Sequence, residues 1–214
     1  MSLGIVKEGA LKNYLTGVLW GAGLLFIIYL ILFITGHTGR VSINGLSIIV
    51  ILLFFGFIIQ GASEEFLMRG YFMNSIAARS NIPFAVIINS VVFMVLHLAN
   101  PGVTFVSMLN ILIFGIIFSL LFLLTENIFV VSGMHFFWNF ALGGLLGSNV
   151  SGMEMKSVFV IPLSGSEIFS GGDFGIEGSL ITTFVGCLLI AVLIMGIRRK
   201  PQNSSYTQNI QSSQ

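Results

Sequence analysis

The stretch LSIIVILLFFGFIIQGASEEFL, Leu46–Leu67, decides the class of fold. It starts as an uncharged run of leucine, isoleucine, valine and phenylalanine, and it ends with two adjacent carboxylates, Glu64 and Glu65. Apolar runs of roughly 20 residues are long enough to cross a bilayer as a helix. A charge at that depth costs about 3 kcal/mol or more, so it is retained mainly where it faces a cavity and serves a function. The stretch therefore predicts a membrane-spanning helix that carries a polar site.

The whole chain of 214 residues has the same character, with 56% hydrophobic and only 8% charged residues. Soluble domains contain about 25% charged residues, so this composition excludes a soluble globular domain. We predict an all-α fold, a polytopic membrane helix bundle of about six transmembrane helices around an intramembrane catalytic cavity. The third span is short for a full crossing, as expected of a helix that ends beside a cavity. The candidate spans are Tyr14–Thr35, Leu46–Leu67, Pro83–Leu98, Val103–Leu124, Ile128–Leu146 and Leu180–Ile197.

Residues 1–200 are predicted to form a single integral membrane domain, in which 147–178 is a Gly- and Ser-rich extramembrane loop and 201–214 is a disordered polar tail. Lysine and arginine favour the cytoplasmic side of a membrane. Cytoplasmic N and C termini would place seven of these residues on or toward the inside and two outside. We therefore expect an integral protein of a bacterial plasma membrane in this orientation. The seven are Lys7, Lys12, Arg69, Arg79, Arg198, Arg199 and Lys200, and the two are Arg40 and Lys156.

Partners and packing follow from the remaining composition. The formal net charge is only +1 with no basic stripe, so nucleic acid is not expected as a partner, whereas membrane lipid is. Cys187 is the only cysteine, which excludes an intrachain disulfide and a cysteine metal cluster. Gly17 with Gly21, and Gly143 with Gly147, have the small-xxx-small spacing of close helix contacts.

Three groups of polar residues lie within the apolar helices. In the first, Glu65 and Arg69 are four residues apart and can pair, while Glu64 points about 100° round the helix axis and is left free. In the second, FMVLH ending at His97, an aromatic ring and an imidazole share one helix face. In the third, HFFWN (His135–Asn139), an imidazole and an amide do so.

Helix-hairpin geometry allows the first two groups to meet. The polar break Ala78–Pro83 reads as a turn, with Glu64 about 17 residues before its centre and His97 about 15 after it, a difference in height of about 3 Å. A straight helix reaching this turn from Leu46 is too long for one crossing, so we expect a kink near Gly61 or an extension past Arg69.

The three groups resemble the motifs of the CPBP family, the CAAX prenyl proteases and bacteriocin-processing or immunity proteins, also called the Abi family. EEFLMR (Glu64–Arg69) is similar to E-E-x-x-x-R, FMVLH (Phe93–His97) to F-x-x-x-H, and HFFWN (His135–Asn139) to H-x-x-x-N/D. Their order and spacing also match, and the resemblance covers about Leu46–Leu146.

This resemblance implies an intramembrane endopeptidase that hydrolyses a membrane-presented peptide or protein. By the same resemblance, Glu64 would activate a water molecule that His97 shares, and His135 with Asn139 would stabilise the oxyanion. A base, its partner and oxyanion donors in one cavity form the set that such chemistry needs.

The supporting residues implied by the family are Glu65, Arg69 and Phe93. A cofactor stays undecided at this stage. One divalent metal such as zinc could be held by three candidate ligands, with water as the fourth, or the carboxylate and water could act without a metal. These candidate ligands are Glu64, His97 and His135.

Blander interpretations remain open beside the enzyme. The Glu65–Arg69 pair alone is more often structural than catalytic, and a lone histidine or amide within the membrane is often only a packing residue. A non-catalytic membrane scaffold or immunity protein is the first alternative, and an ion or proton transporter is the second. As substrates of the enzyme we expect a leader, pheromone or bacteriocin precursor rather than a literal CAAX protein.

Overall fold

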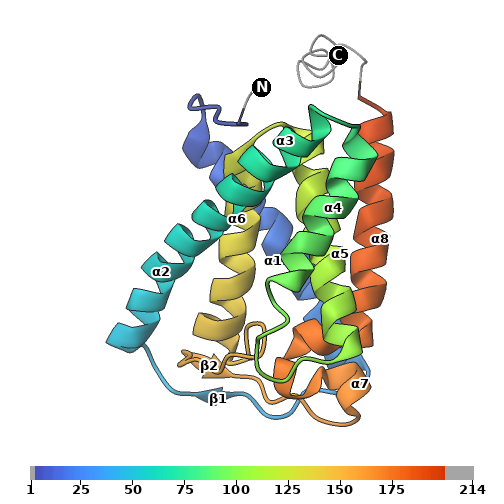
Figure 1. Cartoon of the computed structure of the whole chain (residues 1–214). Helices are drawn as coiled ribbons and strands as arrows, with labels where there is room; N and C mark the ends of the chain where they lie inside the picture. The colour runs from blue at the N-terminus through green and yellow to red at the C-terminus, as the bar shows by residue number, and fades with distance from the viewer. Residues whose placement is uncertain (1–2, 201–214) are drawn as a thin grey trace.

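The structure, a computed structural model, describes residues 3–200, so the tail predicted to be disordered lies outside the described residues. The described chain is a helical bundle with one short antiparallel ribbon at one end (Figure 1). Two segments, η1 and η2, are π-helices. In chain order the elements are α1 (Ala10–Ile34), β1 (Ser42–Ile43), α2 (Ile48–Glu65), η1 (Phe66–Met73), α3 (Asn74–Ala77), α4 (Ile82–Val95), α5 (Phe105–Thr125), α6 (Ile128–Asn139), η2 (Phe140–Leu146), β2 (Phe159–Val160), α7 (Glu167–Ser170), two 3₁₀ turns (Gly172–Phe174, Ile176–Gly178) and α8 (Leu180–Arg198).

The predicted all-α membrane bundle is confirmed. Within residues 3–200, five helices are long and apolar enough to cross a bilayer, namely Ala10–Ile34, Ile48–Ala77, Phe105–Thr125, Ile128–Leu146 and Leu180–Arg198. The helix α4 is shorter, with 14 residues, which corresponds to about 21 Å against a hydrocarbon core of about 30 Å. The short third span therefore ends within the bundle, as its length in the sequence predicted.

The two ends of the bundle differ in their connections. One end, called here the turn end, carries the tight turns 78–81 and 126–127, and both α1 begins and α8 finishes there (Figure 1). The opposite end, the loop end, carries the connections 96–104 and 147–179 together with the β1–β2 ribbon. Every span thus runs between a compact end and an end built from long loops.

Side-chain caps fix where several helices begin. Ser47, Asn81 and Asn127 each accept a backbone N–H from the first turn of the helix that follows. Such caps satisfy donors that a helix start otherwise leaves without partners. Pro83, in the first turn of α4, needs no N–H partner there. The polar breaks in the sequence therefore do become turns.

The two predicted glycine pairs behave differently. A Cβ atom on Gly17 would overlap the carbonyl oxygen of Val130, and one on Gly21 would lie 3.0 Å from that of Met134. This pair therefore lets α1 pack closely along α6. Gly143 and Gly147 instead face side chains and backbone of the loop 150–160, so the second pair was wrongly predicted as a helix contact.

The helix that carries the glutamates does not end at its glycine. α2 continues through Gly61, where a Cβ would lie 3.0 Å from the backbone nitrogen of Phe136 in α6, and it passes directly into η1. Helix geometry changes only after Glu65, and the extension past Arg69 ends at Ala77. α2 packs against α6, whereas η1 packs against α4. π-Helical turns are rare and occur often at functional sites.

Candidate active site

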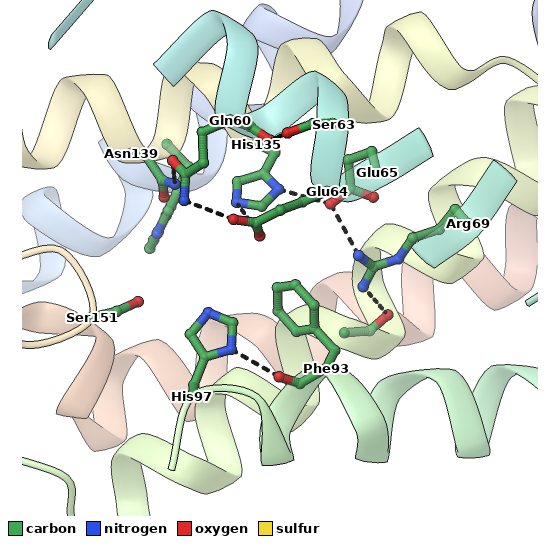
Figure 2. Close-up of polar contacts among 12 residues, drawn as sticks. Gln60, Ser63, Glu64, Glu65, Arg69, Phe93, His97, His135, Asn139 and Ser151 are labelled. Carbon is green, nitrogen blue, oxygen red and sulfur yellow. Dashed lines mark hydrogen bonds and ion pairs between the residues drawn. The ribbon is translucent and has the colours of Figure 1, made fainter. Parts of the chain in front are cut away.

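The two adjacent glutamates of α2 lie in different surroundings. Arg69 donates from Nη1 to Oε1 of Glu65 at 3.0 Å, and neither side chain is exposed. The second guanidinium nitrogen, Nη2, donates to the carbonyl oxygen of Gly115 in α5 at 3.1 Å. The Glu64 side chain, in contrast, keeps 33% of its surface exposed. Glu65 is thus part of a buried ion pair, and Glu64 is open to a cavity (Figure 2).

His135 lies between both glutamates. Its Nδ1 is 2.7 Å from Oε1 of Glu65, the same oxygen that accepts from Arg69, and its Nε2 is 3.9 Å from Oε2 of Glu64 (Figure 2). A carboxylate paired with arginine can only accept, so Nδ1 carries the proton. The imidazole ring also stacks on Phe118 of α5, with ring centroids 4.9 Å apart. The ring is thus fixed on two sides, and Nε2 faces the cavity.

His97 approaches from the opposite wall, just beyond the end of α4. Its Nδ1 donates to the carbonyl oxygen of Phe93 at 2.8 Å, which leaves Nε2 free to accept a hydrogen bond (Figure 2). The Phe93 ring lies 4.7 Å from the imidazole and 4.6 Å from the Arg69 guanidinium carbon. Phe93 therefore connects the second motif to the buried ion pair of the first.

The sequence analysis did not single out Gln60, although this residue lies four residues before Glu64. Its Nε2 donates to Oε1 of Glu64 at 2.8 Å, and its Oε1 accepts from Nδ2 of Asn139 at 3.1 Å. One amide thus links the carboxylate of α2 to the amide of α6. The signal was present as a lone polar residue one helical turn from Glu64 in an apolar stretch.

All four residues expected to be catalytic line one cavity of about 340 Å³: Glu64, His97, His135 and Asn139. The polar groups come from α2, α6 and the turn after α4, and the walls between them are largely aromatic and aliphatic, including Phe93, Phe114 and Phe118. Groups far apart in the chain therefore share one space inside the bundle. Close packing of hydrocarbon side chains does not separate them.

Glu177 is the second residue that the sequence analysis missed, because it was grouped with the charges of an extramembrane loop. Its side chain lines the same cavity and the residue is only 3% exposed. Its Oε1 accepts from the indole Nε1 of Trp138 at 2.8 Å, and its Oε2 accepts from the backbone N–H of Ser151. Burial raises the pKa of the Glu177 carboxyl, while these two donors and the nearby His97 act in the opposite direction.

We expect Glu177→Gln to lower the free energy of unfolding by about 1–3 kcal/mol, because the amide group of glutamine cannot accept from both donors. Trp138→Phe, which removes the indole donor, should have a similar effect. The double variant should cost less than the sum of the two, since the residues share one hydrogen bond. Thermal unfolding in detergent measures all three, with Glu167→Gln, an exposed glutamate of the same loop, as the control. Strict additivity would contradict the contact.

The candidate metal ligands do not form a ligand set. Among residues 3–200, no three His, Cys, Asp or Glu side chains are gathered closely enough to hold one ion. Glu64 and His135 approach each other, but His135 uses Nδ1 for Glu65, and His97 stands on the other wall. Zinc sites need three protein ligands within about 2.3 Å of the ion. The arrangement does not fit a metal, so no step below is assigned to one.

Comparisons with known proteins bear on the same part of the chain. Residues 46–141 match the family model described as Rce1-like, type II CAAX prenyl endopeptidase, which confirms the family resemblance over these residues. No curated protein and no solved structure matches. Together with the five apolar helices, the match supports an integral membrane protein, and over residues 46–141 the chain is similar to CAAX-protease-like intramembrane endopeptidases.

Proposed function

We propose that this chain, whose residues 46–141 match the Rce1-like CAAX prenyl endopeptidase family, hydrolyses a peptide bond in a membrane-associated peptide or protein, with its own carboxylate as the base. The observation that carries the proposal is the single cavity that Glu64, His97, His135 and Asn139 all line. A water molecule held there would contact a base and a second acceptor at once.

In the proposed first step, Glu64 takes a proton from a water molecule whose second hydrogen is donated to Nε2 of His97. The water oxygen forms a bond to the carbonyl carbon of the substrate, and the carbonyl oxygen becomes an oxyanion. The Gln60 amide, which donates to Glu64, holds the carboxylate in place. A base positioned in this way contributes about 10²–10⁴-fold to a rate.

The oxyanion would be stabilised from α6. Asn139 can donate from Nδ2, and His135 can donate from Nε2 when its ring carries both protons, a state that the carboxylate of Glu65 stabilises. When the intermediate collapses, the carbon–nitrogen bond breaks and the proton held by Glu64 passes to the leaving amine. Arg69, which holds Glu65, positions these groups from outside the cavity, and Phe93 does so from the cavity wall.

In this proposal the enzyme cleaves a leader, pheromone or bacteriocin precursor. The enzyme lies in a bacterial plasma membrane, with both termini of the chain in the cytoplasm. Residues 1–200 act as one domain in the proposal. The same cavity could serve an immunity function if cleavage removes an incoming peptide.

A cleavage assay tests the proposal. The purified chain, reconstituted in liposomes, is mixed with fluorescence-quenched peptides of two kinds, namely hydrophobic leader peptides and a farnesylated peptide with a C-terminal CAAX sequence. We expect cleavage of at least one leader peptide, with a rate that changes less than twofold on addition of a chelator. No cleavage of any peptide would contradict the enzyme. Glu64-dependent ion flux in the same liposomes would favour a transporter instead, and a phenotype unaffected by substitutions in the motifs would favour a scaffold.

A further inference from the structure

The cavity of the candidate site extends toward only one end of the bundle. Its inner wall is formed by mid-helix residues such as Met68, Phe118 and His135. Toward the loop end it is lined by residues of the long connections, namely Asn100, Val150, Ser151, Met153 and Glu177. None of the described residues of the tight turns 78–81 and 126–127 lines it. A peptide that approaches along the bundle axis therefore reaches the four motif residues from the loop end.

The same two ends differ in charge. The turn end carries six lysine and arginine residues, and the loop end carries two. Contacts place both chain ends of the described region at the turn end: the backbone N–H of Ile128 donates to the carbonyl oxygen of Gly4 at 2.9 Å, and Lys200 pairs with Glu126 at 3.0 Å. The six are Lys7, Lys12, Arg79, Arg198, Arg199 and Lys200, and the two are Arg40 and Lys156.

Positive charge marks the cytoplasmic side because short connections rich in lysine and arginine are not translocated. Arg69 does not enter this comparison, because it is buried in the bundle and paired with Glu65. The loop end also contains exposed acidic residues, Glu154, Glu167 and Asp173, but acidic residues contribute little to orientation. The excess of lysine and arginine at the turn end, six against two, therefore assigns the turn end to the cytoplasm. Both ends of the described chain lie at this same end of the bundle (Figure 1).

We infer that the cavity is entered from the outer side of the membrane, opposite the chain termini. Its substrate is then a peptide segment that has been exported or is crossing the membrane, rather than a C-terminal segment presented from the cytoplasm. The inference rests on the proposed function only in that it calls the bound peptide a substrate. The direction in which the cavity opens does not depend on catalysis. It also separates leader-type precursors, which are exported, from cytoplasmic prenylated proteins, which are not.

Thiol labelling tests the direction of the opening without any need for activity. In a Cys187→Ser background, a single cysteine is placed either at Met153, at the cavity mouth, or at Val6, before α1 at the turn end. The two positions are equally exposed, at 43% each. Spheroplasts of a bacterial host that express each variant are treated with a membrane-impermeant maleimide, before or after permeabilisation.

We expect Met153→Cys to react in intact spheroplasts and Val6→Cys to react at least tenfold more after permeabilisation. The reverse pattern, or equal labelling of both positions in intact spheroplasts, would overturn the inference. A second arm adds the quenched leader peptide to intact spheroplasts and to inside-out vesicles, with faster cleavage expected in the spheroplasts. Cleavage confined to the inside-out vesicles would overturn the inference while supporting the proposed function. Labelling of Met153→Cys in intact spheroplasts, without cleavage by either preparation, would support the inference and contradict the proposed function.

Discussion

Glu64→Gln is expected to lower the rate of peptide cleavage about a thousandfold while the protein still folds. The amide has the size of the carboxylate and its oxygen can still accept from Gln60, so the links to α6 through Gln60 remain. What is lost is the ability to take a proton from water. The measurement is the initial rate with a quenched leader peptide at equal amounts of folded protein, judged by size-exclusion elution and thermal unfolding.

Two further variants make this result specific to the cavity. Glu167→Gln removes an exposed carboxylate of the loop end and should leave the rate unchanged. His97→Ala removes the second acceptor of the proposed water and should cost about a hundredfold, which falls within the range for a positioned proton-transfer group. If Glu64→Gln retained more than a tenth of the rate, Glu64 would not be the base, and another carboxylate of the cavity, Glu177, would have to be considered.

Arg69→Ala is expected to lower the free energy of unfolding by about 3–5 kcal/mol. The substitution leaves Glu65 charged in a site with no exposed surface, and it also removes the donor to the Gly115 carbonyl that ties η1 to α5. Breaking a buried pair costs more than the pair contributes, because the remaining charge has no water to solvate it. Thermal or denaturant unfolding in detergent, followed by circular dichroism, measures the change.

Arg79→Ala is the matched control, since Arg79 is an exposed arginine in the turn directly after the same continuous helix. It should change the stability by less than about 0.5 kcal/mol. The double variant Glu65→Gln with Arg69→Met should recover part of the loss, because it removes both buried charges. If Arg69→Ala and Arg79→Ala proved equally stable, the buried ion pair would not stabilise the bundle around the site.

Spacing along single helices was sufficient to predict part of the site. The i, i+4 pair of Glu65 and Arg69 depends only on helical periodicity, and it forms as the spacing allows. Equal distances of Glu64 and His97 from one turn were enough to expect them at one level, and both line the same cavity. Such features depend on the rise per residue, which is nearly the same in every α-helix.

Contacts between distant segments could not be predicted in the same way. Nothing in the sequence near Phe118 separates it from the other apolar residues of α5, yet its ring is the one that stacks on His135. Glu177 follows a glycine-rich turn, and its place in the cavity depends on how the loop folds back onto α5, where Asn110 donates to the carbonyl oxygen of Glu177 at 2.7 Å. The catalytic roles themselves remain predictions.

The wide turns of η1 have a consequence for how this protein tolerates changes in length. A π-helical segment accommodates more residues per turn than an α-helix, so the residues before and after it point in directions that a uniform α-helix would not give them. Removing one residue from Phe66–Met73 would let the segment tighten to α-helical turns, and the extra length held in the wide turns would absorb much of the deletion. The same deletion within a uniform α-helix would rotate everything beyond it by about 100°. A single-codon deletion in η1 that spares Arg69 should therefore be less harmful than one at an apolar position of α2, although both variants would still encode every charged side chain of the site.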